Sequence, residues 1–461
     1  MTRRPVRFAL LLAALLAVRT APAGAQSPPA SPAPASPMTI DLATALRLAG
    51  ASSIDVQIAQ QRLEAARAAS TNAVAQFLPW LSAGASYRRH GDLIQDVVGT
   101  IVVADKHSYT LGGTGNLQVD VGDALFRTLA ARQTIRAADY DVRGQQQEAV
   151  YRAASAYFDL LEAQAAVAAT TEALAISRTY EAQLHRAVEV GIAFKGDELR
   201  VKVQSQRNEL ALQQAVEQQR TQAARLAETL RLDPAVELLG QTAELAPLPM
   251  ELPSAPAREL IRQALAARPE LGSAQAAVGA AEATVKAARF GPLIPSLAAQ
   301  VFLGGLGGGR NDAPSTFGGS RDYFAAFAWR IGPGGLGDFG RVRAAKARLS
   351  EARWTVEKAK DGIARQVVEA LARVQSQEQQ VRTAKEALDA ADQALALTEG
   401  RRQFEVGIVL ENILAQQDQA RARQDYARTL GEFNKSQYGL SRALGLLQTA
   451  TPSPTAPPAQ P

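Results

Sequence analysis

The chain has 461 residues, no cysteine and a net charge of +5, from 50 Lys and Arg against 45 Asp and Glu. Without cysteine there is no disulfide framework and no thiolate metal site. The basic residues form no stripe and only 5% of the residues are aromatic, which argues against nucleic-acid binding.

Residues 1–25 have the pattern of a secretory signal peptide. A basic start, Met1–Arg7, precedes an apolar run, Phe8–Val18, that is too short to span a bilayer. The small residues Ala21–Ala25 then suit cleavage before Gln26. We therefore expect the mature chain to leave the cytoplasm.

Pro-rich segments flank the rest of the chain. Residues 26–38 predict a disordered linker, and residues 448–461 predict a disordered tail. No later segment is apolar for long enough to form a transmembrane helix. A membrane form of this exported chain therefore requires β-strands.

The first predicted element after the linker is a helix. Apolar residues recur at helical intervals over residues 39–77, with Asp41 placed to cap the start. The same pattern returns over Ala257–Phe290, where Pro269 predicts a break at Arg268.

After each of these segments the apolar period changes from 3.6 to two, which indicates β-strands. The predicted strands lie at Leu81–Tyr87, Leu117–Val121, Leu297–Leu303 and Tyr323–Ile331. Strands of about ten residues with one apolar face can cross a membrane when tilted. We expect six side chains to face lipid, namely Leu117, Val119, Leu297, Val301, Phe327 and Trp329.

Two stretches between the strands, Arg88–Ser108 and Gly304–Asp322, are rich in Gly, Asp, Ser and Asn and predict long loops on one side. Four strands cannot close into a barrel, and open strand edges are costly in lipid. Three chains would supply twelve strands and remove the edges.

A very long helix follows each pair of strands. Asp123–Val190 and Phe339–Val406 contain no proline, and about 68 residues at 1.5 Å each predict rods of roughly 100 Å. A four-three spacing in the second rod indicates a coiled-coil seam, formed by Leu349, Ala352, Val356, Ala359, Ile363, Leu371, Val374, Val381 and Leu388.

Each rod ends at a glycine, Gly191 or Gly407, that can reverse the chain. The return helices are predicted at Asp197–Leu232 and Glu411–Leu446. Apolar residues such as Ile192 flank these reversals, where little of the same chain is available to bury them. They either mark a partner surface or pack between the two helices of one hairpin, and both interpretations stay open.

The chain is an internal duplication. Pro79 and Pro295, like Gly191 and Gly407, stand about 216 positions apart. We expect a first repeat at residues 39–232, an inter-repeat linker at 233–255 and a second repeat at 256–447.

No pattern indicates catalysis. Gly332–Gly337 matches a dinucleotide fingerprint, but the helix after it is far too long for a nucleotide-binding unit, so we interpret it as a bend between strand and helix. His90, His107 and His185 are not spaced as metal ligands and are interpreted as surface or loop residues. We therefore predict that the protein is not an enzyme and holds no metal or cofactor.

Together these residues resemble the outer membrane efflux protein family, the TolC-like channel-tunnels. The resemblance covers about Thr39–Leu447 and rests on Phe77–Leu81 and Leu293–Leu297 at the strand starts, Tyr157–Leu161 in the first rod, and the two Val-Gly-Ile tips. It implies a mostly α-helical homotrimer with two repeats per protomer. A small twelve-stranded β-barrel in the outer membrane would continue into a long coiled-coil α-barrel across the periplasm.

The resemblance also implies a function and partners. Members of the family are passive exit ducts that receive substrates from an inner-membrane pump through a periplasmic adaptor, with outer-membrane lipid around the barrel and no nucleic acid. The residues that match the adaptor-docking tips are Val190, Gly191, Ile192, Val406, Gly407 and Ile408.

The periplasmic entrance is expected to carry Asp197 and, in the second repeat, Asn412. Phe404 and Val409 stand where the best-known member has a Tyr and an Arg that help to hold the entrance shut. The resemblance therefore leaves the closure of this entrance open.

Two alternative functions stay open at this point. The outer-membrane component of type I protein secretion would share every feature above. A soluble periplasmic coiled-coil scaffold would explain the helices but not the four predicted strands.

Overall fold

The computed structural model describes residues 38–241, 245–248, 250, 255–310, 316–403 and 409–447. The chain divides between Ser36 and Pro37 into two units, and all described residues belong to the second. The predicted signal peptide, the linker up to residue 37 and the tail from residue 448 lie outside the described residues. So do Phe404, Val406, Gly407 and Ile408 at the second tip.

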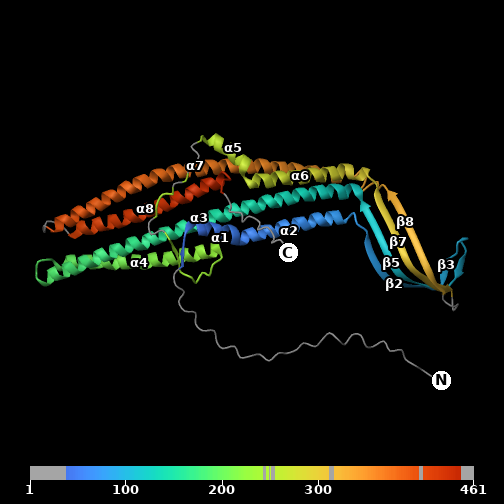
Figure 1. Cartoon of the computed structure of the whole chain (residues 1–461), viewed down its shortest axis with the longest axis horizontal. Coiled ribbons are helices and arrows are strands. Elements are labelled where there is room, and N and C mark those ends of the chain that lie inside the picture. Colours follow the sequence, from blue (N-terminus) through green and yellow to red (C-terminus); the bar gives the residue numbers. More distant parts are fainter. Residues whose placement is uncertain are drawn as a thin grey trace, which may run out of the picture. The chain divides into compact units, whose positions relative to one another are not determined.

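The described elements come in two runs of similar order, as the duplication predicts (Figure 1). The first run contains β1 (Met38–Ile40), α1 (Leu42–Ser52), α2 (Ile54–Ala75), β2 (Trp80–His90), β3 (Leu93–Gln95), β4 (Ile101–Val103), β5 (Lys106–Asp120), α3 (Val121–Glu189) and α4 (Lys195–Leu230). The second contains β6 (Leu238–Gly240), α5 (Ala257–Ala267), α6 (Pro269–Phe290), η1 (Gly291–Leu293), β7 (Ser296–Arg310), β8 (Thr316–Ala328), α7 (Phe339–Gln403) and α8 (Val409–Ala443).

The first helix of each run is broken at the same place. Asp41 caps α1 as predicted, because its carboxylate accepts a hydrogen bond from the Thr44 amide at 3.4 Å. Pro269 starts α6, and the predicted break at Arg268 is confirmed. The matching break at Ser53 between α1 and α2 was not predicted, since no proline marks it.

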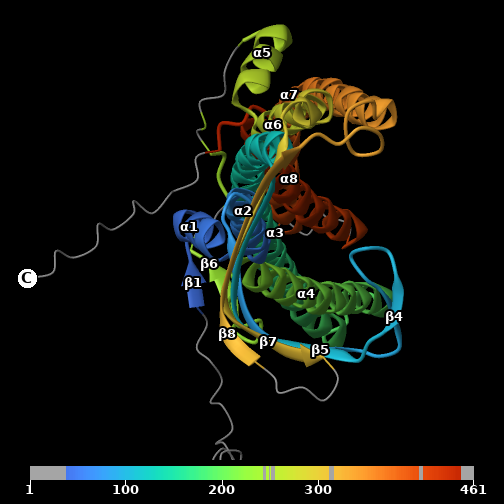
Figure 2. The same cartoon turned by 90° about the vertical axis from the view of Figure 1, so that its right-hand side faces the viewer.

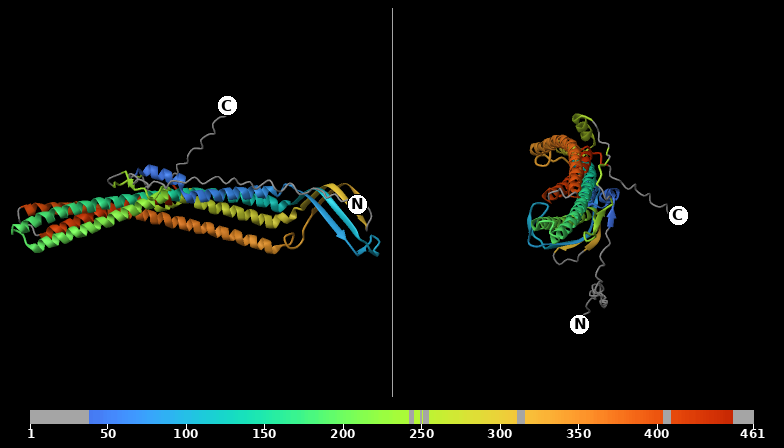
Figure 3. Two further views of the ribbon diagram at one scale, coloured as in Figure 1. Left: turned by 90° about the horizontal axis from the view of Figure 1, so that it is seen from below. Right: turned by 90° about the vertical axis from the view of Figure 1, so that its left-hand side faces the viewer.

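The two long helices are the rods that the sequence predicts, with 69 residues in α3 and 65 in α7. Helix α3 packs on α2, α4, α6 and α8, and α7 packs on α5, α6 and α8, so the helices run side by side (Figure 3). The predicted seam is confirmed, because Val356, Ile363 and Val374 are buried between α7 and its neighbours.

Each repeat has its own apolar core near the middle of the rods. The first core centres on Tyr157, Phe158 and Leu160, which pack with α1, α4 and β6. The second centres on Val367 and Leu440. The motif Tyr157–Leu161 is therefore a packing motif, and a parallel β1–β6 pair that the sequence did not predict closes the first core on one side.

The principal sheet is antiparallel, with strand order β2-β5-β7-β8. The two repeats meet where β5 pairs with β7, and β2 and β8 form the edges. Figure 2 shows the strands side by side, with the separate β3–β4 hairpin extending beyond them. Among the described residues, no helix is long and apolar enough to cross a membrane.

Of the two predicted long loops, the first is largely present and the second is mostly wrong. In the first, β2 continues to His90 and β5 begins at Lys106, and the connection between them contains the short β3–β4 hairpin. Strand β7 continues through its glycines to Arg310, while β8 ends at Ala328 and not at Ile331. Glycine-rich sequence was interpreted as loop, but here it forms strand.

The glycines of the sheet make room for aromatic rings of the same strand or of a neighbouring strand. A Cβ atom at Gly304 would lie 2.8 Å from the ring of Phe302, and a Cβ at Gly112 would lie 2.9 Å from the same ring. On the other face, the ring of Tyr109 covers Gly307 in the same way. A strand residue without a side chain is needed at each of these positions.

This close packing gives a testable prediction for the sheet. Gly304→Ala places a Cβ against the Leu111 carbonyl oxygen and 2.7 Å from Gly112 Cα, so we expect it to destabilise the folded protein by about 1–3 kcal/mol. The matched control is Gly318→Ala on β8, where a Cβ meets nothing within 4 Å. Thermal unfolding in detergent checks this, and equal midpoints for the two variants would contradict it.

Candidate functional site

The hairpin between α3 and α4 ends in a tight reversal at Gly191. Its φ is +76°, as predicted for a left-handed glycine. The amides of Ile192 and Ala193 both donate to the Ala187 carbonyl, at 2.9 and 3.2 Å, and so close the end of α3. A Cβ at Gly191 would meet nothing within 4 Å, so the requirement for glycine is conformational and not steric.

The apolar side chains around this reversal are exposed. Val190, Ile192 and Phe194 are 69, 77 and 73% exposed. Ala193 instead packs against the cluster of Tyr180, Leu184, Val201 and Ile413 just behind the tip. Of the two interpretations left open by the sequence, packing within the hairpin therefore fails for these three side chains. Their role in adaptor docking stays a prediction.

A buried carboxylate organises the polar side of the tip. Glu198 Oε2 lies 2.5 Å from Lys195 Nζ, and its Oε1 lies 3.0 Å from His185 Nδ1. His185 Nε2 is 3.4 Å from Glu189 Oε1. The hydrogen bond from Lys195, and then that from His185, lower the pKa of Glu198 below its ordinary value. Four polar residues thus tie the end of α3 to the start of α4.

Sequence reasoning missed this group, because His185 was interpreted as an ordinary surface or loop residue. The available signal was local. His185 and Glu189 stand one helical turn apart, and Glu198 lies in the first turn of the return helix, where a carboxylate is favourable.

The two predicted entrance residues lie in different environments. Asp197 is half-buried in the first turn of α4, and its carboxylate is 3.0 Å from Arg200 Nη1. If several chains bring their Asp197 carboxylates together, each chain also brings the Arg200 guanidinium that pairs with its carboxylate. The place of Asp197 at the entrance stays a prediction.

Asn412 is only 3% exposed, so the described chain does not present it on an open surface as the entrance prediction requires. It lies on the buried side of α8, where its Oδ1 accepts from Gln416 Nε2 at 2.7 Å. The next residue, Ile413, packs against Val201 of α4. Asn412 is thus an interior residue of α8, next to a side chain that packs on α4.

The two faces of the principal sheet differ in chemistry. The face that the sequence assigns to lipid is mostly apolar, although it also carries Arg321, opposite Leu303. Leu297, Val301, Phe327 and Trp329 are exposed on or next to this face, and Leu117 is half-buried. Trp329 lies just beyond β8, where its indole Nε1 donates to the Leu293 carbonyl at 3.1 Å.

Val119 corrects the lipid-face prediction. It has the expected register, opposite Leu297, but it is only 4% exposed. It lies two residues before α3 begins, in the last row but one of the β5–β7 pairing, close to where α3 packs on η1. The helix junction therefore buries a side chain that strand alternation alone would place outside.

Aromatic residues border the exposed apolar face at both ends. Tyr109 stacks on Phe317 at 5.7 Å at the outer end, and Phe327 meets Trp329 at 6.1 Å near the helices. On β7, Gly307 lies opposite Tyr109 and Leu297 lies opposite Phe327. These two residues are ten positions apart, which is about 33 Å along the strand. With an ordinary strand tilt this becomes an apolar band about 25 Å tall, the height found in outer-membrane strands.

The glycine-rich segment Gly332–Gly337 forms a bend between β8 and α7, as the sequence analysis proposes. Gly332, Gly334 and Gly337 all have positive φ. The Gly334 amide donates a hydrogen bond to Asp338 Oδ2 at 2.9 Å. In a nucleotide site such an amide would donate to a phosphate, but here it is already bonded to a side chain of the protein.

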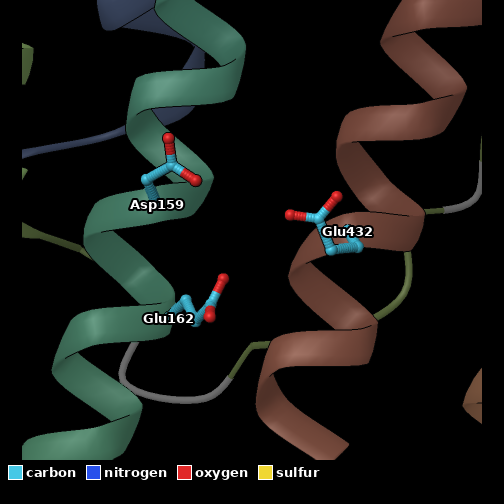
Figure 4. Close-up of side chains that lie close together, drawn as sticks. All are labelled: Asp159, Glu162 and Glu432. Atoms are coloured by element: carbon cyan, nitrogen blue, oxygen red, sulfur yellow. The ribbon is translucent and has the colours of Figure 1, made fainter.

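One group of carboxylates among the described residues could be mistaken for a metal site. Asp159 and Glu162 on α3 face Glu432 on α8 (Figure 4). Lys435 Nζ lies 2.6 Å from Asp159 and 2.5 Å from Glu432 and takes the place of a cation. Burial opposes its charge, but hydrogen bonds to these two carboxylates raise the pKa of Lys435. The group is an ionic clamp between the repeats.

The model of the family described as "Outer membrane efflux protein" matches residues 45–230 and 260–446. A comparison with curated proteins gives no match. The two matched segments coincide with the two runs of elements described above.

Solved structures share the fold. A membrane protein from Pseudomonas aeruginosa has 20% identity, a TM-score of 0.74 and coverage of 88% of this chain and 93% of its own. The Campylobacter jejuni CmeC outer membrane channel has 17% identity and a TM-score of 0.73, with coverages of 88 and 85%. The Neisseria gonorrhoeae MtrE outer membrane channel has 18% identity and a TM-score of 0.69, with coverages of 88 and 89%.

The polar group at the tip predicts an acid-sensitive hairpin. Because the folded-state pKa of Glu198 is below the ordinary 4.5, its stabilising contribution is present above pH 4.5 and is lost as pH falls through the lowered value. Glu198→Gln should abolish this part of the pH dependence. The readout is hydrogen exchange of the α3–α4 tip, measured above and below pH 4.5.

The matched control for this prediction is Glu189→Gln, because Glu189 is an exposed partner of the same histidine. It should leave the acid dependence of the tip nearly unchanged. The same pH profile for Glu198→Gln and the unmodified chain would contradict the role of Glu198.

Proposed function

The chain belongs to the outer membrane efflux protein family, and from this premise we propose that it is the homotrimeric exit duct of an efflux assembly, coupled to an inner-membrane pump by a periplasmic adaptor. Membership makes it an outer-membrane efflux channel with a periplasmic helical extension, and not an enzyme. Channels of this family act in tripartite efflux. The trimer and the docking residues are the proposed parts.

The open edges of the principal sheet carry the proposal of a trimer. Within the described part of the chain, β2 and β8 have no further strand beside them. In a membrane each unpaired backbone N–H and C=O group costs several kcal/mol, roughly the value of a lost hydrogen bond in hydrocarbon. Three chains that pair β8 of one with β2 of the next would give a closed sheet of twelve strands.

Exposed apolar residues on the helices support the same assembly. Ile54 and Ile58 on α2 stand one turn apart and are exposed, as are Trp354 and Val368 on α7. Neighbouring copies would cover such lateral surfaces in a ring of helices. The alternative of a soluble coiled-coil scaffold leaves the four-stranded sheet and its apolar band without a role.

The tip supports the proposed coupling to a partner. Val190, Gly191 and Ile192 form an exposed apolar point on a reversal that only glycine enters without strain. Val406, Gly407 and Ile408 repeat this sequence in the second copy. We therefore propose that both tips of each protomer contact the adaptor.

Cross-linking tests the trimer. Because the chain has no cysteine, introduced cysteines are the only thiols. Each test protein carries one cysteine on β8 and one on β2, so that a disulfide can join neighbouring chains. We expect disulfide-linked trimers in at least one case when Ser320→Cys is combined in turn with Ser82→Cys, Gly84→Cys or Ser86→Cys. Ser296→Cys on the interior strand β7 should give none with the same partners. Light scattering in detergent is the second measurement, and a monodisperse monomer would refute the proposal.

A substitution at the tip tests docking. Gly191→Trp should strain the reversal by roughly 1 kcal/mol or more and cover the contact point, while an added Cβ meets no neighbour. We expect normal trimers, loss of efflux and loss of cross-links to the adaptor. Ile192→Ser should weaken the same cross-links with the backbone unchanged.

The control for docking is Gly50→Trp, the same change in open space on α1 and far from the tip in sequence. It should retain efflux. Wild-type efflux by Gly191→Trp trimers would mean that this reversal is only structural and that the adaptor binds elsewhere.

A further inference from the structure

The polar face of the sheet carries an aromatic patch that passive conduction does not require. Phe302 on β7 lies opposite Thr114 on one side and Asp322 on the other. Phe324 follows Asp322 by two residues on β8 and so lies on the same face, diagonal to Phe302. Two aromatic rings therefore flank one carboxylate.

The ring of Phe302 lies against the wall of the sheet. It covers Gly112 and Gly304, at 2.9 and 2.8 Å from the positions that their Cβ atoms would occupy. One side of the ring thus packs on backbone, and the other side faces the space in front of the sheet. The two glycines allow a large aromatic surface without narrowing that space.

The patch borders a hollow of about 410 Å³, which is also lined by Thr114, Gln300 and Ser320. Phe324 is more than half exposed, and Asp322 is exposed. The Asp322 carboxylate accepts one long hydrogen bond, 3.4 Å from the Ser320 hydroxyl. None of the residues that line the hollow is basic.

The other charges of this face lie far along the strands. Arg88, the basic residue nearest in register, is six residues from the Phe302 row, or about 20 Å. That exceeds the screening length of about 8 Å at physiological salt. Arg321 is adjacent in sequence, but strand alternation places it on the opposite face. The field in the hollow is therefore that of Asp322.

A carboxylate between two aromatic faces suits one class of ligand. Aromatic faces attract cations through the ring quadrupole, and the carboxylate adds an ion pair. The apolar body of an organic cation can also cover the rings, which a strongly hydrated inorganic ion cannot do. We propose that the patch formed by Phe302, Asp322 and Phe324 binds aromatic or quaternary organic cations on their way through the channel.

This inference rests on the proposed function for its place inside the duct, where a trimer would repeat the patch three times. Because β8 is an edge strand, the adjoining copy would complete one side of each hollow. The wall of the duct would then hold organic cations briefly, while anions of the same size would pass without binding.

Calorimetry of the purified protein in detergent tests the patch with two probes of the same shape, tetraphenylphosphonium and tetraphenylborate. Tetraphenylphosphonium should bind the unmodified protein, and Asp322→Asn and Phe324→Leu should each weaken this binding by roughly fivefold to tenfold, the effect of one cation–π contact or ion pair. Tetraphenylborate should be unaffected by either change. Phe302 is left intact because it covers two glycines.

Two variants are matched controls, Asp120→Asn at the helix end of the same face and Phe327→Leu on the opposite face. Both should bind tetraphenylphosphonium like the unmodified protein. Equal affinity of unmodified and Asp322→Asn protein for the cation, or equal loss for the anion, would overturn the patch. If trimers transport but the unmodified protein and Asp322→Asn bind tetraphenylphosphonium equally, the patch alone is refuted. If the protein is a monomer and the two still differ in this affinity, the trimeric duct alone is refuted.

Discussion

The pairing of β5 with β7 joins the two repeats, and the positions of the long helices depend on it. The register runs without interruption from Lys106 opposite Arg310 to Asp120 opposite Ser296. Helix α3 leaves the end of β5 directly, and α6 enters β7 through η1 at the same end. A Cβ at Gly122 would lie 2.7 Å from Gly291 Cα, so these two segments cross at backbone contact. The strand register therefore fixes how α3 and α6 pack.

The second repeat reaches its long helix by a different route. In the first repeat β5 passes into α3 without a turn, whereas β8 needs the glycine bend before α7. The Arg341 guanidinium then binds both carboxylate oxygens of Asp123, at 2.8 and 2.7 Å, and ties the start of α7 to the start of α3. Farther along, Lys435 joins α8 to α3. In the second repeat the glycine bend separates the sheet from α7. Ion pairs to α3 then hold α7 and α8 in place.

Periodicity in the sequence was sufficient for the main architecture and insufficient where segments from distant positions meet. The seam through Val356 and Ile363 follows from spacing alone, because a helix that packs along its length must repeat its apolar face. The glycines of β7 predict a loop from sequence alone, since the rings of Phe317 and Tyr109 that cover Gly305 and Gly307 come from other strands. Val119 and Asn412 differ from the prediction for a related reason, because both side chains are buried in the folded chain, Val119 beside the start of α3 and Asn412 within α8. The polar group of Glu198 needed the hairpin to close before its members could meet.

Apolar side chains are buried within the chain in the middle of the long helices, and are left exposed at the two ends of the molecule. In the middle of the rods, Tyr157, Leu226 and Leu440 are fully buried by elements of the same chain. At the two ends this self-sufficiency is lost, since the sheet has open edges and the tip exposes Val190 and Ile192. A protomer can therefore form its cores alone, whereas its sheet edges and its tip stay uncovered. Under the proposed function, copies of the chain and lipid cover the sheet, and a partner covers the tip. Under the proposed function, the ends that remain incomplete in one chain are the ends where the channel meets the membrane and the adaptor.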